Sequence, residues 1–262
     1  MAHTLYENFY LSNEVEDAYN SHLDLMRFVT VDNGLVGHAG MKRIINRYTA
    51  TKGNTEKLTK GQGNSKAIEV SFTPHEYEIA LAQNKFAYYD EDEMQDPNVV
   101  PVGMNMAGAD LFNTANADIF AEFNKTTQEV KVAQFDFDAF ADASAELELE
   151  NLEGVEKFAF VCPLDVAELR KNMKETLQYV QAFATAGYVG TVAGIHIYTK
   201  KDAVAGTIIM GTKQAVTYFN KKGVEIEQKR DADVRLNEIF SRKYYIVALT
   251  DETKAVKIVK NA

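Results

Sequence analysis

Residues 215–228 read Ala-Val-Thr-Tyr-Phe-Asn-Lys-Lys-Gly-Val-Glu-Ile-Glu-Gln: a mostly apolar run, a polar segment that ends in glycine, and a stretch in which apolar and acidic residues alternate. Val, Ile, Tyr and Phe favour strands, and the Asn-Lys-Lys-Gly sequence is typical of a turn. The stretch therefore predicts strands over 215–219 and 224–228, joined by a turn over 220–223.

The segments beside this stretch predict a mixed domain that ends in β structure. Residues 158–162 are wholly apolar, as expected of a buried strand. Pro163 suits the first position of a helix, and we expect that helix to lie on strands 158–162 and 195–199. Its predicted buried face consists of Leu164, Val166, Leu169, Met173 and Leu177. The remaining predictions are strands over 207–210, 244–250 and 255–259, and a short helix over 231–242.

The amino-terminal half contains the strongest helical signal. Leu111, Ala115, Ile119 and Phe123 repeat every four residues and predict a long helix over 102–124. A second helix is expected after Asp138, before the acidic stretch 146–153.

A long hairpin is predicted ahead of that helix. Residues 41–51 and 67–73 form its strands, and the polar tip 52–66 cannot offset the entropy of its own ordering by burial. Residues 1–32 are expected to form an arm that docks on another surface, and 33–40 a glycine-punctuated turn. Three further alternating apolar residues are expected to continue a strand: Tyr77, Ile79 and Leu81.

Charge divides the chain unevenly. The 262 residues sum to −10, yet residues 41–66 hold seven Lys or Arg against one Glu, a balance of +6, so the rest sums to −16. An acidic protein is poorly suited to wrap DNA by neutralising phosphates. The sequence contains no run of eighteen apolar residues, so it predicts no membrane-spanning helix.

Signals for enzyme chemistry are weak. The glycine-containing segments 33–40 and 187–194 match neither a Walker A loop nor a dinucleotide fingerprint. The segment 136–142 begins like a calcium loop but lacks the central glycine and closing glutamate, which favours helix capping. The five histidines have no ligand spacing, and His196 is expected on a solvent-facing strand position. Cys162 is expected to be a buried small hydrophobe. We therefore predict no catalytic, cofactor-binding or metal-binding residue.

The order of arm, basic hairpin, long helix and mixed domain resembles the Hong Kong 97-type capsid fold of tailed phages. Residue-level similarity lies in the carboxy-terminal third. Gly187–Lys200 resembles that family's glycine-rich segment before a strand, and Gly206–Lys257 resembles its closing pattern. The chain thus resembles the major capsid protein of tailed double-stranded DNA bacteriophages.

This resemblance implies an α+β fold in four parts. They are an N-terminal arm (1–40), an extended E-loop hairpin (41–81), a peripheral domain with a spine helix (82–130 and 226–262) and an axial domain (131–225).

The implied function is structural, with no enzymatic activity or cofactor. The chain would self-assemble into hexamers and pentamers of an icosahedral shell enclosing phage double-stranded DNA, in the host bacterial cytoplasm, and remain in the virion capsid. Its implied partners are itself, a portal protein and packaged DNA as a non-specific neighbour, which an acidic wall would let slide. Met1 lies only about 40 residues before the hairpin, so if Met1 is the native start, scaffolding is a separate protein or unnecessary.

Charge also suggests how the hairpin is used. Residues 67–98 carry eight acids against one Lys, a balance of −7. We expect the hairpin tip to lie over an acidic surface of an adjacent subunit. The interface candidates are Lys52, Lys57, Lys60 and Lys66 at the tip, and Asp90, Glu91, Asp92 and Glu93 as their partners.

Two alternatives stay open. Encapsulin nanocompartments resemble the same fold and enclose an enzyme cargo, but a cargo groove should be apolar and include the arm, which here is acidic and tyrosine-rich. A small nucleotide-using enzyme is the other alternative, and nucleotides or divalent metals should then raise its melting temperature.

Overall fold

The computed structural model describes residues 24–51, 54–147, 155–172 and 188–261. The helices are η1 (Met26–Phe28), α2 (Asp90–Gln95), α3 (Val99–Phe123), α4 (Phe137–Glu146), α5 (Pro163–Asn172) and η2 (Glu252–Lys254). The amino-terminal strands are β1 (Thr30–Asp32), β2 (Lys42–Ala50), β3 (Val70–Glu78), β4 (Ala80–Tyr89) and β5 (Glu129–Val132). The later strands are β6 (Lys157–Val161), β7 (Tyr188–Val192), β8 (Ile195–Thr199), β9 (Thr207–Thr212), β10 (Val216–Asp231), β11 (Leu236–Leu249) and β12 (Ala255–Lys260).

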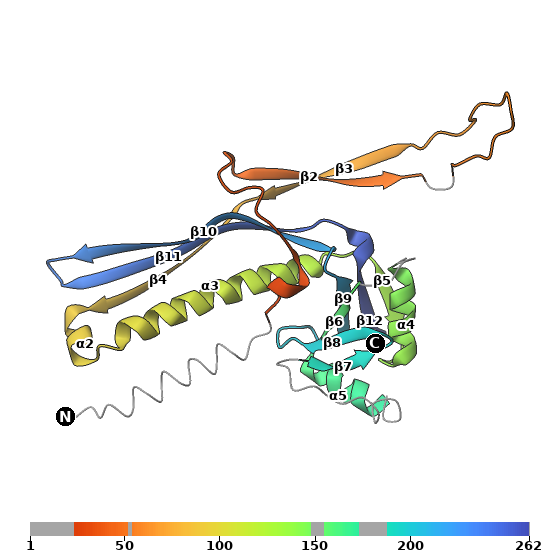
Figure 1. The fold of residues 1–262 in the computed structure, drawn as a ribbon. Coiled ribbons are helices and arrows are strands. Elements are labelled where there is room, and N and C mark those ends of the chain that lie inside the picture. The colour runs from red at the N-terminus through yellow and green to blue at the C-terminus, as the bar shows by residue number, and fades with distance from the viewer. Residues whose placement is uncertain (1–23, 52–53, 148–154, 173–187, 262) are drawn as a thin grey trace.

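These strands form three sheets. One has the order β1-β10-β11-β4, a second the order β5-β12-β9-β6-β8-β7, and the third is the β2–β3 hairpin. The first sheet lies along α3, the second lies near one end of α3 beside α4 and α5, and the hairpin projects away from both (Figure 1). No helix within the described ranges is long and apolar enough to cross a bilayer.

The long helix predicted from the four-residue repeat is confirmed as α3. It begins at Val99, three residues ahead of the expected start, because Pro101 stands in the first turn, where helical N–H groups have no intrahelical acceptor. The predicted stripe of Leu111, Ala115, Ile119 and Phe123 is buried. Of these, Ala115, Ile119 and Phe123 pack into one hydrophobic core.

Strand β6 explains the wholly apolar run. It pairs in parallel with β8 and antiparallel with β9, and all five of its residues are buried. Phe158 and Phe160 join the core around α3, whereas Ala159 and Val161 join a second core under α4 and α5. A strand between two cores needs apolar side chains on both faces.

Two predictions in the closing segment are wrong. Residues 216–231 form one strand, β10, whose irregularities between Asn220 and Glu225 replace the predicted turn. Residues 236–249 form strand β11 where a helix over 231–242 was expected. Asn237, Ile239 and Ser241 are buried at every second position, and that period belongs to a strand. The chain reverses within 231–235 instead.

The helix after β6 is confirmed, but one member of its predicted buried face is wrong. Val166 and Leu169 are buried, while Leu164 is 73% exposed. Two residues correspond to about 200° of helical rotation, which puts Leu164 opposite Val166. Met173 and Leu177 lie outside the described residues.

The hairpin is confirmed with a longer second strand. β3 runs to Glu78 through Pro74, which pairs with Asn46 in this two-stranded sheet. The prediction of a single strand through Tyr77, Ile79 and Leu81 is wrong, because the chain turns at Ile79. Strand β4 then joins the sheet β1-β10-β11-β4, called the long sheet below.

The described part of the expected arm packs on its own subunit. Leu25, Phe28 and Val29 are fully or almost fully buried in the core around α3, and β1 pairs in parallel with β10. Residues 1–23 lie outside the described residues.

Candidate subunit-interface site

The hairpin has two faces, set by its strand register. Tyr48 is paired with Phe72 and Ile44 with Glu76, so these residues share one face. The intervening residues, including Ile45, Arg47 and Tyr77, form the other face, which is turned toward the body and half-buried. Each face therefore has its own role.

Arg47 fixes the body-facing side. Its Nε and Nη2 donate to the carbonyl oxygen of Leu249 at 3.1 and 2.8 Å, and Nη2 also donates to the Tyr77 hydroxyl at 3.3 Å. Its Nη1 pairs with the Glu252 carboxylate. Beside it, Ile45 and Tyr77 pack on a small apolar cluster of the long sheet. The base of the hairpin is thereby attached to the end of β11.

Two other basic residues at the base are also paired within the subunit. The Lys42 ammonium lies 2.8 Å from Glu76 and 3.0 Å from Glu78, and these hydrogen bonds raise its pKa above the usual value. The Arg43 guanidinium lies 4.3 Å from the Phe219 ring centre and 3.8 Å from Asp32. Part of the +6 charge of residues 41–66 is therefore used inside the subunit.

The tip keeps the remaining charge. Lys57, Lys60 and Lys66 are exposed, and Lys52 lies outside the described residues. The loop is closed by Glu56, which accepts hydrogen bonds from the backbone N–H of Ser65 at 2.7 Å and from its hydroxyl. These bonds lower the pKa of Glu56, so it stays ionised and structural.

The four acidic candidates lie on α2. Arg230 lies 2.6 Å from one oxygen of Asp90, and the Asn237 amide donates to the other at 2.6 Å, which holds the pKa of Asp90 below its usual value. Glu91 pairs with Arg235 at 2.6 Å.

Asp92 accepts from the Tyr89 backbone N–H at 3.1 Å, whereas Glu93 is exposed. Two of the four carboxylates thus already have a basic partner in the same subunit. α2 and the hairpin tip lie at opposite ends of the molecule (Figure 1), so the tip cannot reach the α2 of its own subunit.

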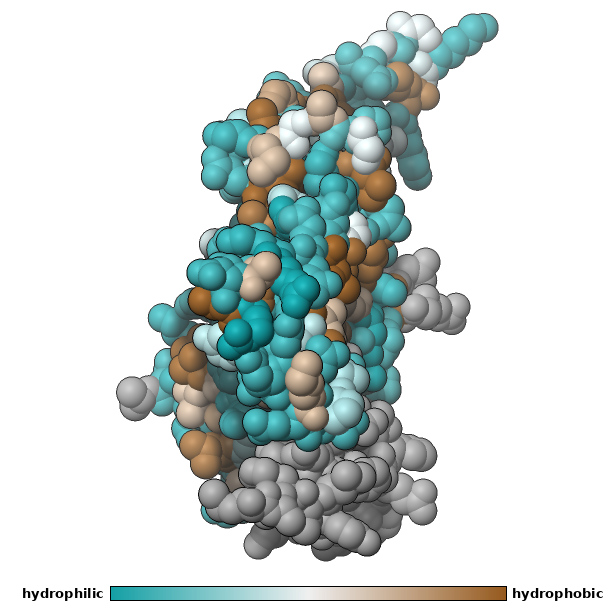
Figure 2. Space-filling model, turned by 90° about the vertical axis from the view of Figure 1, so that its left-hand side faces the viewer, coloured by the Kyte–Doolittle hydropathy of each residue, from teal (hydrophilic) through white to brown (hydrophobic). Residues whose placement is uncertain are grey.

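Sequence reasoning missed the outward face of the hairpin. Ile44, Tyr48, Val70 and Phe72 are 60–68% exposed on it. Figure 2 shows hydrophobic residues among hydrophilic ones in the upper part of the molecule, where the hairpin lies. The alternation at residues 67–73 was the available signal, but alternation does not say whether the apolar face is covered.

The weak enzyme signals have structural roles. Asp136 caps α4 by accepting from the Ala139 N–H at 3.0 Å, as predicted, and Cys162 is buried, as predicted. His196 is half-buried, with Nδ1 3.2 Å from the Thr191 hydroxyl, rather than fully solvent-facing. Among the described residues, no three His, Cys, Asp or Glu side chains gather as a metal site requires.

Comparison with known proteins gives a short sequence match and broad fold matches. No family model matches the chain. Over 107 residues it is 33% identical to the major capsid protein of Staphylococcus phage phiMR11, and this match spans only 39% of each chain. The capsid of cyanophage P-SCSP1u has a TM-score of 0.66 at 15% identity, over 92% of this chain and 89% of that chain. The SrpI encapsulin of Synechococcus elongatus has a TM-score of 0.67 at 11% identity, over 90% and 86%.

The fold is therefore that of capsid shell proteins, with mixed helices and sheets. Within this class the chain resembles phage major capsid proteins, since its sequence match is to one of them. These relatives indicate a structural protein.

Proposed function

We propose that this chain is the major capsid protein of a tailed double-stranded DNA bacteriophage. It would form hexamers and pentamers of an icosahedral shell, assembled in the host bacterial cytoplasm and retained in the virion. The observation that carries the proposal is the projecting hairpin, fixed at its base and unsupported at its tip, on a capsid fold (Figure 1). A separate scaffolding protein, a portal protein and packaged DNA are the proposed partners.

In Hong Kong 97-type terms, residues 41–81 are the proposed E-loop and α3 the proposed spine helix. Residues 82–130 and 226–262 make up the proposed peripheral domain, and 131–225 the axial domain. The pairing of β4 with β11, and of β11 with β10, supports the first grouping, because it joins distant segments in the sheet along α3. Residues 1–40 are the proposed arm, of which 24–29 pack on the subunit's own core.

Assembly proceeds through many weak contacts summed over a closed shell. We propose that the tip lysines lie over acids of an adjacent subunit. Asp92 and Glu93 are the leading members of the Asp90–Glu93 group, because Asp90 and Glu91 already pair with arginines. Each exposed pair contributes ~0.2–1 kcal/mol. Such contacts set register and assembly rate more than final strength.

Electron microscopy of the purified protein, alone and with its scaffolding partner, tests the proposal. We expect rings of five or six subunits or closed particles. A 29.3 kDa monomer under all salt and scaffold conditions, measured by light scattering, would refute it.

Charge reversal tests the electrostatic contact. Lys57→Glu with Lys60→Glu should slow or block assembly and leave the circular dichroism of the subunit unchanged, because both side chains are exposed. Adding Asp92→Lys and Glu93→Lys should restore part of the rate. Undiminished assembly of the reversed variant at low and moderate salt would contradict the contact, whereas failed rescue alone would move the acidic partner elsewhere.

An encapsulin-like nanocompartment is the second candidate, favoured by the fold match to SrpI over 90% of this chain. Neighbouring genes for a terminase and a portal would support a phage capsid. A neighbouring gene for a cargo enzyme, together with that enzyme inside the particles, would support the alternative.

A further inference from the structure

A small hollow under the base of the hairpin is lined by more acids than bases. It encloses about 310 Å³ between β3, the carboxyl-terminal half of α3 and β11. Its charged lining residues are Glu78, Asp118, Glu122 and Lys125, three acids against one base. Small-molecule pockets enclose about 300–1,000 Å³, so this hollow suits a small ligand.

Two of the acids are placed unfavourably for the helix that carries them. Asp118 and Glu122 stand four residues apart near the end of α3, so their side chains lie on one face of the helix. Like charges at this spacing repel each other, and Glu122 in the last turn also faces the negative end of the helix dipole. A bound cation would relieve both effects, so the placement points to a site for positive charge.

Glu122 lines the hollow with a buried oxygen that has no donor. The residue is only 8% exposed, and among the described residues its Oε2 atom has no hydrogen-bond partner. The other oxygen, Oε1, pairs with the ammonium group of Lys125, whose side chain is 60% exposed. A buried carboxylate oxygen without a donor destabilises the fold, and a donor placed in the hollow would restore the lost hydrogen bond.

Asp118 keeps its negative charge because its partner is neutral. Its Oδ2 atom accepts a hydrogen bond from the Tyr245 hydroxyl at 2.6 Å. Burial, and then the hydrogen bond and charge of Asp118, raise the pKa of Tyr245, so the tyrosine stays protonated. Tyr77 also lines the hollow, and the Arg47 that donates to its hydroxyl has its own acid partner in Glu252. The faces of tyrosine rings attract cations.

The third acid already has a base within the subunit. The Lys42 ammonium lies 3.0 Å from Glu78, which neutralises that carboxylate. Asp118 and the Oε2 atom of Glu122 therefore remain for a ligand.

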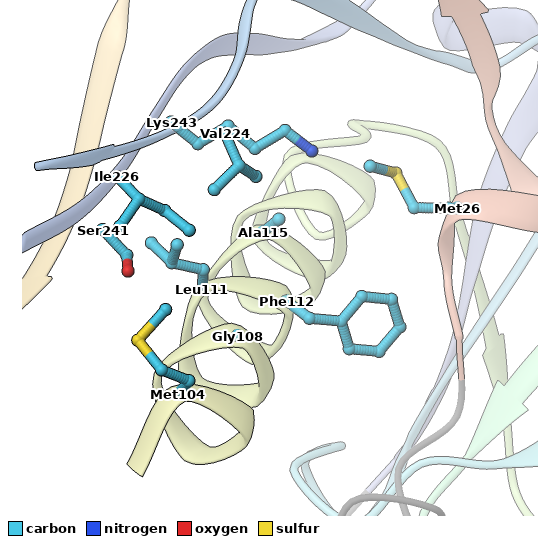
Figure 3. Close-up of a pocket in the computed structure, with 10 residues that line it drawn as sticks. All are labelled: Met26, Met104, Gly108, Leu111, Phe112, Ala115, Val224, Ile226, Ser241 and Lys243. Atoms are coloured by element: carbon cyan, nitrogen blue, oxygen red, sulfur yellow. The ribbon is translucent and has the colours of Figure 1, made fainter. Parts of the chain in front are cut away.

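Two other hollows have the opposite charge. The groove between α3 and the strands β10 and β11 is lined mainly by apolar side chains such as Met104, and its one charged lining residue is Lys243 (Figure 3). Another hollow is lined by Arg27 and Lys213 against a single acid, Glu156. Both would repel a small cation, so the acidic hollow differs from them in the ligand that it suits.

The spacing and number of acceptors define the class of ligand. Cβ atoms four residues apart on a helix are about 5–6 Å apart, and a short aliphatic diamine carries an ammonium group at each end of a chain of similar length. A lysine or arginine side chain of another protein brings one cationic group and would neutralise one acid. A bare metal ion needs more ligands, and in the described part of the chain no three His, Cys, Asp or Glu side chains gather as it requires.

We propose that this hollow, called the amine site, binds an aliphatic diamine or a longer polyamine, with one ammonium group at Asp118 and another at the Oε2 atom of Glu122. The proposal goes beyond the shell function and does not depend on it. Because β3 of the hairpin lines the site together with α3 and β11, an occupied site ties the base of the hairpin to the body.

Calorimetric titration of the full-length chain with putrescine, a short diamine, tests the site. The ionic strength is held constant with NaCl, so that a change in general screening does not contribute. Putrescine should bind about tenfold or more tightly than butylamine, which has a single ammonium group. Glu122→Gln should weaken putrescine binding by about tenfold or more, because it removes the charge and keeps the shape of the side chain.

The matched control is Glu146→Gln, the same change at an exposed acid in the last turn of α4. This variant should bind putrescine as the wild type does. Circular dichroism and thermal unfolding without amine check that the variants fold, and Glu122→Gln should be no less stable than the wild type, since it removes the repulsion from Asp118. If Glu122→Gln does not fold, Asp118→Asn, which keeps an acceptor for Tyr245, takes its place and should weaken binding similarly.

Two titration results would overturn the amine site. One is no measurable binding of millimolar putrescine by the wild type. The other is equal affinity in the wild type and in the Glu122→Gln and Glu146→Gln variants, which would mean general attraction of a cation to an acidic chain. The shell function stands in both cases.

Hydrogen exchange checks where the amine lies. Putrescine should slow exchange at the base of the hairpin in the wild type and leave it unchanged in the Glu122→Gln variant. Binding without slower exchange at that base would place the amine elsewhere and refute the site.

Discussion

Two glycines in α3 provide a matched test of how this helix packs on the long sheet. A Cβ added at Gly103 would lie 2.3–2.6 Å from three ring carbons of Phe86, whereas at Gly108 it would meet nothing within 4 Å. Carbon atoms in favourable contact lie ~3.5–4.0 Å apart. The Gly103→Ala variant must therefore displace the Phe86 ring or the helix, and the Gly108→Ala variant need displace nothing.

The magnitudes follow from two opposing effects. Exchanging a glycine inside a helix for alanine stabilises the fold by ~1 kcal/mol, and this is the full effect expected for Gly108→Ala. At Gly103 the same gain is opposed by an overpacking cost of ~1–3 kcal/mol. We therefore expect Gly108→Ala to be more stable than Gly103→Ala by ~1–3 kcal/mol. Each kcal/mol shifts the Tm of a domain of this size by ~2–4 °C.

Urea and thermal unfolding of the unassembled subunit, followed by circular dichroism, would measure the difference. Adding Phe86→Leu to the Gly103→Ala variant should recover part of the lost stability, because the smaller side chain leaves room for the methyl group. Equal stabilities of the two alanine variants, or a more stable Gly103→Ala, would refute the packing of β4 on α3.

Three more substitutions probe other parts of the fold. Leu169→Asp places an unpaired carboxylate at a position only 3% exposed, so we expect a loss of ~3 kcal/mol or more and insoluble protein; a soluble, folded variant would contradict this buried face. Arg47→Met keeps the apolar stem but removes the hydrogen bonds to the Leu249 carbonyl, so hydrogen exchange at the base of the hairpin should speed up, and unchanged exchange would speak against the attachment. The pKa of Asp90 is lowered in the folded state by Arg230, so its contribution is present above the unfolded pKa of about 4 and is lost as pH falls through the folded pKa. Asp90→Asn should therefore flatten the acid limb of thermal stability against pH, and an unchanged acid limb would contradict the pairing.

Elements whose period and burial agree were predictable from the sequence. The four-residue repeat from Leu111 to Phe123 predicted α3 correctly, because one face of that helix packs into a hydrophobic core. The apolar run of β6 gave a buried strand because that strand lies between two cores. In both cases local pattern and tertiary environment point to the same structure.

The closing strands were mispredicted where tertiary pairing overrides local preference. Residues 231–242 contain charges at spacings compatible with a helix, yet Ile239 pairs with Gln228 on one side and Phe86 on the other. Two neighbouring strands fix β11 as extended, and neither is visible in a local window. The Asn220–Gly223 segment becomes an irregularity within β10 for the same reason.

The candidate site was predictable only in its charge. The exposed tip lysines follow from composition, since a polar loop whose one apolar residue is Leu58 has little to bury. The attachment through Arg47 was not predictable, because its acceptor at Leu249 is 202 residues away in the chain. The exposure of Ile44, Tyr48, Val70 and Phe72 likewise depends on how the hairpin is held against the body, and a local sequence pattern does not show this.

The place of β12 has a consequence for the timing of synthesis. Among the described strands, β5 joins its sheet only through β12, with Glu129 paired to Lys257. A ribosome adds about 5–20 residues per second, so β12 is synthesised about 6–25 s after β5. Until β12 is made, β5 has no strand neighbour and β9 has one open edge. Such unpaired edges are prone to pair with strands of another chain, so the last six-residue strand closes two edges at once.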